Sequence, residues 1–140
     1  MAKVLKKDML PHYDSTRDGR DRLDLIKDGI PAPSAHIQAD RIVYHPDDTS
    51  AKHYHVGAYQ VFVMLYGEAT VCNPLDCKTF KKGQVAIIEP DEVHWFENHS
   101  GENFSFVEFW APPPDETVWI VEGDVCTWQE HPLVQPTSKR

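Results

Sequence analysis

Three histidines and one glutamine have the side-chain types and the spacing of a metal site. His53 and His55 are separated by one residue, Gln60 follows five residues after His55, and His94 lies 39 residues beyond His55. Imidazole nitrogens and an amide oxygen can each donate a lone pair to a divalent cation. These four side chains predict a site for one divalent transition metal ion, with Fe, Ni, Zn, Mn and Co all compatible.

Short β-strands must position these side chains. Residues i and i+2 of a strand project from the same face, so His53 and His55 point into one volume. Residues 60–66 read as the next strand, and a turn at "VGAY" would bring Gln60 back beside the histidine pair. His94 opens a further predicted strand after a proline-containing turn.

From residue 36 to residue 121 the sequence consists of short β-rich runs, and no amphipathic helix of useful length lies between them. Such runs, separated by turn residues, are typical of an antiparallel sandwich or barrel. We therefore predict an all-β fold in three parts: an N-terminal arm over 1–35, irregular apart from a short strand or turn, a β-barrel over 36–121, and a C-terminal tail over 122–140. The predicted strands are 36–44, 51–56, 59–66, 69–72, 84–89, 93–98, 103–110 and 117–121.

Composition and charge exclude several classes of function. The chain has 140 residues, 41% of them hydrophobic, which suits one domain with its own core. A net charge of −8 disfavours nucleic acid and anionic membranes as partners. No run approaches the roughly 18 apolar residues of a membrane span, and the first residues lack the apolar segment of a signal peptide, so we predict a cytoplasmic protein.

The three cysteines do not suggest a disulfide framework or a zinc site. Cys72, Cys77 and Cys126 are odd in number and form no C-x-x-C pair. We expect reduced, partly buried thiols.

The spacing around the histidine pair resembles the first sequence motif of the cupin superfamily, G-x5-H-x-H-x3,4-E-x6-G. His53, His55 and Gly67 match their positions. Gln60 stands at the glutamate position, and Asp47 stands where the leading glycine would be.

The second cupin motif, G-x5-P-x-G-x2-H-x3-N, is matched by Gly83, His94 and Asn98. Glu89 and Asp91 replace its proline and its second glycine. These departures affect turn positions and leave the ligand positions filled.

The resemblance implies a small, single-domain, metal-dependent cupin. Its fold would be a double-stranded β-helix, or jelly-roll, barrel with the irregular N-terminal arm outside it. Its metal ligands would be His53, His55, Gln60 and His94.

Glutamine in place of glutamate changes the charge of the predicted site. Gln60 is neutral, so an ion held by three neutral imidazoles and this amide keeps both of its positive charges. Such an ion is a stronger Lewis acid and suits an anionic substrate or a developing enolate. The ligand set also resembles that of small cupins of pectin and alginate breakdown, which help to open unsaturated uronates. We predict an enzyme of isomerase, lyase or ring-opening type that moves a proton on a small oxygenated, anionic substrate.

Two other functions are open to the same residues. One is an Fe(II)-dependent cupin dioxygenase, which would consume O2 with its substrate. The other is a non-catalytic cupin that binds a small ligand.

Strand parity predicts which residues surround the metal. With Gln60 pointing inward, Phe62 and Met64 share its face, and Phe96 shares the face of His94. These apolar side chains either contact the substrate or simply fill the barrel.

Three polar side chains are candidates for chemistry. If the face of residues 104, 106, 108 and 110 points inward, Glu108 is desolvated, its pKa is raised, and it can act as a general acid or base. The alternative is a surface salt bridge. Tyr44 could donate a proton and Arg41 could bind a substrate carboxylate, but they project to opposite faces of one strand, so only one of them can face the cavity.

We also predict a homodimer. Residues 1–35 cannot form a core of their own, and small cupins commonly pair through an edge strand. An arm of this length is a plausible clasp between two copies.

Overall fold

The computed structural model describes residues 2–131, which fold into twelve short strands and one turn of 3-10 helix, η1 (Lys7–Met9). All eight predicted strands occur, several of them shorter than predicted, but the strands at 77–81 and 128–130 were not predicted, and two strands lie in the arm over 1–35. In chain order they are β1 (His12–Ser15), β2 (Asp21–Ile26), β3 (Gln38–Tyr44), β4 (His53–His55), β5 (Tyr59–Tyr66), β6 (Glu68–Cys72), β7 (Cys77–Lys81), β8 (Val85–Ile88), β9 (Trp95–Glu97), β10 (Phe104–Ala111), β11 (Thr117–Trp119) and β12 (Trp128–Glu130).

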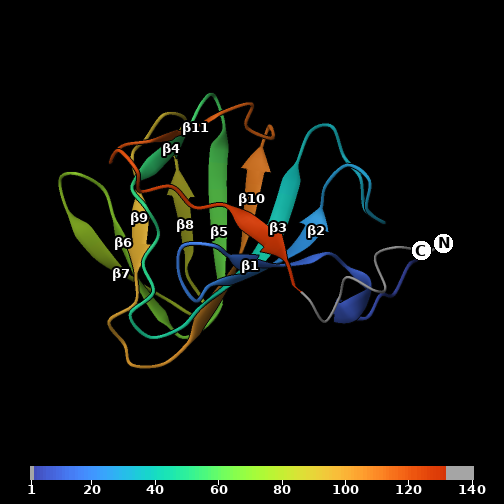
Figure 1. Ribbon diagram of the computed structural model, residues 1–140, viewed down its shortest axis with the longest axis horizontal. Coiled ribbons are helices and arrows are strands. Elements are labelled where there is room, and N and C mark those ends of the chain that lie inside the picture. The colour runs from blue at the N-terminus through green and yellow to red at the C-terminus, as the bar shows by residue number, and fades with distance from the viewer. Residues whose placement is uncertain (1, 132–140) are drawn as a thin grey trace.

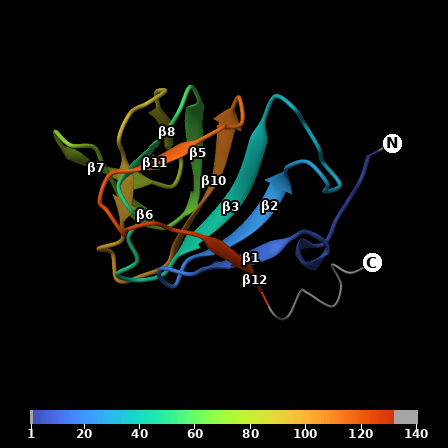
Figure 2. The same cartoon turned by 45° about the horizontal axis from the view of Figure 1, so that its top comes forward.

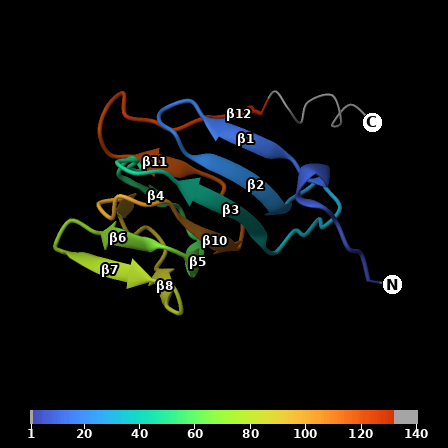
Figure 3. The ribbon, with the colours of Figure 1, turned by 90° about the horizontal axis from the view of Figure 1, so that it is seen from below.

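The strands form two layers (Figure 1, Figure 3). The large layer is a seven-stranded sheet in the order β12-β1-β2-β3-β10-β5-β8, and all of its pairs are antiparallel. The small layer contains the β7-β6-β9 sheet and the β11-β4 pair, which is linked to the β9 region by an isolated bridge between His53 and His94. The metal-ligand candidates therefore lie where the two layers face each other.

The N-terminal arm is more regular than the sequence analysis expected. β1 and β2 both join the large sheet, and β2 pairs along the length of β3 (Figure 2). β12, from the predicted tail, pairs with β1. The charged residues and the Asp-Gly turn that made this segment look irregular lie on and between these strands, because an added edge of an antiparallel sheet tolerates polar side chains. The domain boundaries at 35/36 and 121/122 stay predictions.

Aromatic side chains from both layers form the core. Phe62, Phe96 and Phe106 make mutual ring contacts, with centroid distances of 4.8–5.0 Å. Such edge and tilted contacts stabilise a core beyond simple burial of apolar area. The core fills the barrel next to the histidine cluster and fixes the strands that carry it.

The expectation for the cysteines is wrong in part. Cys72 and Cys77 form a disulfide, and Cys126 is a buried free thiol. The reason is the register of the β6–β7 hairpin, which places Cys72 directly opposite Cys77 with their Cα atoms 4.1 Å apart. Spacing along the chain does not reveal a cross-strand pair unless the hairpin register is known.

The described part of the chain contains no helix long and apolar enough to cross a bilayer. The cytoplasmic location stays a prediction.

The turn positions of both motifs share one backbone conformation. Gly67 and Gly83 have φ values of 82° and 88°, and Asp47 and Asp91 have 69° and 65°. These values lie in the left-handed region, which glycine enters freely and aspartate tolerates better than most residues. The aspartates thus keep the turns that the motif glycines would make.

Candidate metal centre

The three histidines converge as the strand pattern predicted. His53 and His55 come from β4, and His94 comes from the segment just before β9, opposite His53. One ring nitrogen from each lies within 4.8 Å of the other two. A cluster of this size from two adjacent strands can close on a single cation.

Backbone carbonyls set the tautomers of two rings. Nδ1 of His53 lies 2.6 Å from the Ala51 carbonyl oxygen, and Nδ1 of His94 lies 2.9 Å from that of Glu92. A carbonyl only accepts, so each Nδ1 must carry the proton and each Nε2 keeps its lone pair. Such partners commonly orient metal-binding histidines.

Burial keeps the three rings neutral. Desolvation, with the neighbouring His94, lowers the pKa of His53 to about 3. Desolvation, with His53, lowers the pKa of His55 to about 3, and desolvation lowers that of His94 to about 4 despite the Glu92 carbonyl. All three imidazoles are therefore neutral near pH 7, which is the form that binds a metal.

Gln60 lies in the same cavity as the three histidines. Within residues 2–131, its buried Oε1 and the buried Nε2 of His55 have no hydrogen-bond partner. Two buried polar atoms left without a partner are costly unless something else binds them. Together with the free Nε2 atoms of His53 and His94, they fit a divalent cation, so these residues suit the metal that the resemblance implied.

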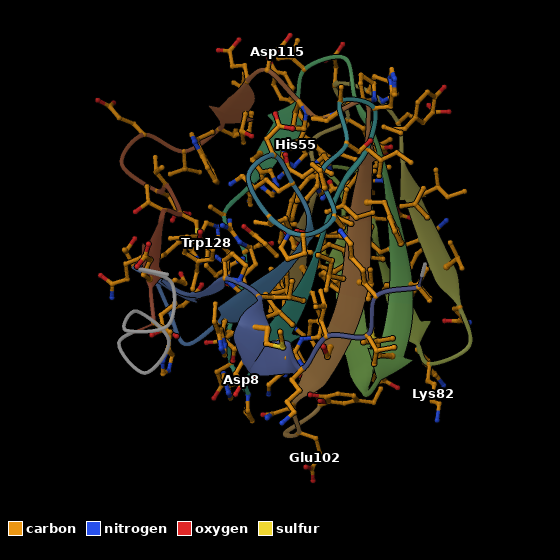
Figure 4. All side chains as sticks on the ribbon, turned by 90° about the vertical axis from the view of Figure 1, so that its right-hand side faces the viewer. Asp8, His55, Lys82, Glu102, Asp115 and Trp128 are labelled. Carbon is orange, nitrogen blue, oxygen red and sulfur yellow. A yellow bond between two sulfur atoms is a disulfide. The ribbon has the colours of Figure 1, made fainter. Side chains whose placement is uncertain are left out.

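The donors line a cavity of about 330 Å³ on the concave side of the large sheet. His55 and Trp128, both labelled in Figure 4, belong to the lining of this cavity. Residues from β2, β3, β10, β11 and β12 also reach the cavity. Its lining includes Arg20, Arg22, Gln38, Asp40, Ile42, Tyr44, Ser50, Ala51, Phe62, Phe96, Glu108, Trp110, Pro114, Thr117, Trp119, Cys126 and Trp128.

Glu108 lies in this cavity beside Gln60 and Asp40. Gln60 Nε2 donates to Glu108 Oε1 at 3.3 Å, and Asp40 is the cross-strand neighbour of Glu108. Burial, with the charge of Glu108, raises the pKa of Asp40 well above its usual range, and burial also raises the pKa of Glu108. Two neighbouring carboxyl groups that are both buried disfavour the doubly ionised state, so the pair favours keeping a proton.

The two candidates on β3 separate as parity requires. Tyr44 lines the cavity with Asp40 and Ile42, and its ring stacks on Phe104 with centroids 4.5 Å apart. Arg41 is not among the lining residues, and its guanidinium lies 3.6 Å from the Asp21 carboxylate. The structure therefore brings Tyr44, but not Arg41, to the metal-ligand candidates.

The apolar candidates divide in the same way. Phe62 and Phe96 line the cavity, whereas Met64 is buried in the core away from it. Met64 follows Phe62 by two residues on the same face of β5, so it lies farther from Gln60 along the strand and outside the cavity.

Sequence reasoning missed several lining residues. Parity with Tyr44 and Glu108 was enough to place Asp40 and Trp110 on the inner face. Nothing local in the sequence indicated Arg20 or Trp128, which come from segments predicted to be an irregular arm and a tail.

A larger cavity, of about 570 Å³, lies between β6, β7 and β8. No histidine lines it among the described residues, and it has no cluster of metal-binding or acid–base side chains like that around His55.

Comparison with known proteins agrees with this geometry. The family model of the cupin domain, Cupin_2, matches residues 40–110, about half of the chain. The chain belongs to the cupin family. The match begins within β3 and ends one residue before the end of β10. It therefore includes every candidate metal ligand of this cupin. A comparison with curated proteins gives no match.

Solved structures share the double-stranded β-helix fold at low sequence identity. A polyketide cyclase, RemF, from Streptomyces resistomycificus has a TM-score of 0.72 and 15% identity over 89% of each chain. A sugar phosphate isomerase of the cupin superfamily from Silicibacter pomeroyi has a TM-score of 0.71 and 15% identity, covering 91% of this chain and 92% of that one. An uncharacterized double-stranded β-helix protein from Klebsiella pneumoniae subsp. pneumoniae has a TM-score of 0.69 and 20% identity, covering 87% of this chain and 100% of that one. At these identities the likeness establishes the fold and leaves the reaction open.

Proposed function

We propose that this cupin is a metal-dependent enzyme that moves a proton on a small, oxygenated, anionic substrate without a change of redox state. The observation that carries the proposal is the placement of the Gln60 amide, whose oxygen and nitrogen have different surroundings. Its Oε1 is a buried acceptor without a donor in the described chain, in the cavity of the three histidines. Its Nε2 donates to Glu108, which belongs to the carboxyl pair.

The residues of the cavity divide the work between binding and proton transfer. A divalent ion held by the histidines and Gln60 would supply Lewis acidity to a substrate oxygen. Glu108 and Asp40 are two buried carboxyl groups that favour keeping a proton, so the pair can both take and return one. Tyr44, with its hydroxyl inside the cavity, would donate a hydrogen bond to a substrate oxygen that gains charge.

Two solved structures with the same fold support this reaction class. One is a sugar phosphate isomerase and the other a polyketide cyclase. The alternative, an Fe(II) dioxygenase, would use the same ligands and differs in its need for iron and O2.

The test uses protein loaded with Zn(II), which does not change its oxidation state. Small α-hydroxy acids, α-keto acids and unsaturated uronates would be incubated with it in D2O, and proton exchange or isomerisation would be followed by NMR, with O2 measured by an electrode. We expect turnover without O2 consumption. Activity only with Fe(II), accompanied by O2 uptake, would contradict the proposal.

Glu108→Gln tests the role of the carboxyl pair in this assay. The amide cannot exchange a proton at neutral pH, so we expect at least about a hundredfold loss of turnover with Zn(II) content unchanged. Glu102→Gln is the control, because Glu102 is exposed at the end of the molecule away from His55 (Figure 4). Equal activity of Glu108→Gln and Glu102→Gln would remove Glu108 from the mechanism.

A further inference from the structure

Arg20 lies in the turn before β2 and lines the cavity. The residue is buried, with 6% of its surface exposed. Its Cζ lies 5.2 Å from the centre of the Tyr44 ring and 5.3 Å from that of Trp128. Contacts to two rings fix the guanidinium more firmly than a flexible surface arginine would be fixed. The side chain is therefore positioned before any ligand arrives.

The hydrogen bonds of Arg20 leave its outer end poorly satisfied. Nε donates to the Asp18 carboxylate at 2.8 and 3.0 Å. Nη1 donates to the Tyr44 hydroxyl at 3.3 Å, and Nη2 to the Cys126 sulfur at 3.0 Å. Sulfur is a weak acceptor, and a guanidinium has four N–H groups on these two nitrogens. Among residues 2–131, no carboxylate accepts a hydrogen bond from Nη1 or Nη2.

The acids of the cavity are already committed elsewhere. Glu108 and Asp40 are cross-strand neighbours, and Glu108 also accepts from Gln60. Arg22, the second arginine of the lining, lies 3.0 Å from Asp24 and 4.0 Å from Asp40. Asp18 offsets the charge of Arg20 at Nε, so a divalent cation at the histidines would still leave excess positive charge on the side of Nη1 and Nη2.

We propose that Arg20 is the anion-binding residue of this cavity and that its two terminal nitrogens hold the carboxylate of an α-keto or α-hydroxy acid. A carboxylate matches the fork of a guanidinium and accepts two charge-assisted hydrogen bonds from it. The keto or hydroxy oxygen of the same molecule would reach the histidine cluster. This inference rests on the proposed function, since it assigns the substrate class of the same site.

The proposal also explains why Arg41 was the wrong arginine for this role. Arg41 has the right chemistry but lies on the opposite face of β3, paired with Asp21. Arg20 reaches the cavity only because β2 joins the sheet beside β3.

The experiment compares binding of pyruvate with binding of hydroxyacetone, which has the ketone but no carboxylate. Affinities would be measured by isothermal titration calorimetry on the full chain, with and without Zn(II), for the wild type, Arg20→Gln, Arg20→Lys and Arg41→Gln. Zinc content and the near-ultraviolet circular dichroism spectrum would be recorded for each protein. The spectrum reports the packing of the aromatic side chains, Trp128 among them.

We expect Arg20→Gln to weaken pyruvate binding about ten- to a hundredfold, the range for lost hydrogen bonds to a charged group, and to leave hydroxyacetone binding and zinc content unchanged. Arg20→Lys should fall between, because lysine keeps the charge and loses the fork. Arg41→Gln should bind both probes as the wild type does. Wild-type pyruvate affinity in a folded Arg20→Gln protein overturns the proposal.

Two arms keep the result decisive. If both Arg20 variants fail to fold, the metal-free wild type decides: pyruvate binding above that of hydroxyacetone supports the carboxylate subsite, and equal binding overturns it. If the wild type takes up no Zn(II), the proposed function fails, while the metal-free titrations still test Arg20.

Discussion

At the scale of single residues, Gln60 connects metal binding to acid–base chemistry. Its amide nitrogen lies 3.3 Å from a Glu108 oxygen, and Glu108 is the cross-strand neighbour of Asp40. A carboxylate in place of this amide would be a third buried acid in the same place. In the proposed metal site, the neutral side chain would leave the charge of the ion undiminished and would add no third acid beside Glu108 and Asp40.

Gln60→Glu tests this reading of the charge. We expect the variant to keep Zn(II), because a carboxylate oxygen is also a good ligand. We expect roughly tenfold weaker pyruvate binding, since the added negative charge opposes the anion. The redox preference of a bound iron should also shift toward the ferric state. Zinc content, calorimetry with pyruvate and the potential of the Fe-loaded protein would measure these effects.

Gln129→Glu is the matched control for this charge change. Gln129 is exposed on β12 and is not among the cavity residues. It should bind pyruvate as the wild type does. Unchanged pyruvate affinity in Gln60→Glu would remove the argument that the neutral amide favours an anionic substrate.

At the scale of elements, the turns decide how the ligand strands meet. Gly67 joins β5 to β6 with a φ of 82°, and a Cβ added there would lie 2.5 Å from the Asn103 carbonyl oxygen and 2.7 Å from the Phe104 Cα. Gly83 has a similar φ of 88°, but a Cβ there would meet nothing within 4 Å. Substitutions at these two glycines therefore separate the cost of the left-handed backbone conformation from the cost of a steric clash.

Gly67→Ala should therefore destabilise the protein much more than Gly83→Ala. We expect a cost of about 1 kcal/mol for Gly83→Ala from the left-handed conformation alone. For Gly67→Ala we expect more than about 3 kcal/mol, because backbone atoms cannot move aside without shifting β10. Urea denaturation of both variants measures the difference. Equal costs would mean that the Gly67 turn relaxes, so that β10 is not held as closely as the structure indicates.

The same elements explain what the sequence could and could not predict. His53 and His55 lie on β4 and Gln60 lies on β5. Side chains alternate between the two faces of a strand, so the faces of these residues can be assigned without knowledge of the fold. The same alternation also placed Tyr44 and Glu108 once a face was chosen, but it could not choose between Tyr44 and Arg41. That choice depends on which side of β3 faces the small layer, which is a property of the packed sheets.

Long-range pairing was out of reach for the same reason. β2 pairs with β3 across a turn-rich connection, and β12 returns from the end of the described chain to pair with β1. Short polar strands of this kind are stabilised by the sheet they join and have little pattern of their own. Arg20 depends on both pairings, so no local signal could have revealed its place in the cavity.

At the scale of the whole molecule, the large sheet has an apolar outer face as well as an apolar inner one. Val61, Val63 and Leu65 of β5 point away from the core, and Val85 and Ile87 of β8 lie beside them in register. On the other side of β5, Val107 and Phe109 of β10 pair with Val63 and Val61. An antiparallel sheet with one solvated face normally alternates apolar and polar residues, so this face has the composition of a covered one.

A second copy of the chain is the occupant that the charges favour. The chain carries a net charge of −8, so two copies repel each other wherever their acids meet. The outer residues of β5, β8 and β10 named above are all uncharged, so a two-fold contact through this face avoids that repulsion and is self-complementary. We call these seven residues the outer face. The outer face allows a more specific test of the predicted homodimer than the N-terminal arm does. The arm would have to be tested by truncation, and removing residues 1–34 would also remove β1 and β2 from the sheet.

Sedimentation velocity of point variants tests this homodimer. Val63 is 38% exposed and Ile87 is 63% exposed, so Val63→Lys and Ile87→Lys should be tolerated by a single copy. In a dimer each would bury unpaired charge at the interface, and we expect a change from twice the chain mass to the chain mass at micromolar concentration. Leu75→Lys is the matched control, because Leu75 is 94% exposed in the β6–β7 turn and lies outside the outer face. A dimer that survives both outer-face substitutions would place the contact elsewhere, and a wild type that sediments as one chain would leave the outer face exposed in a monomer.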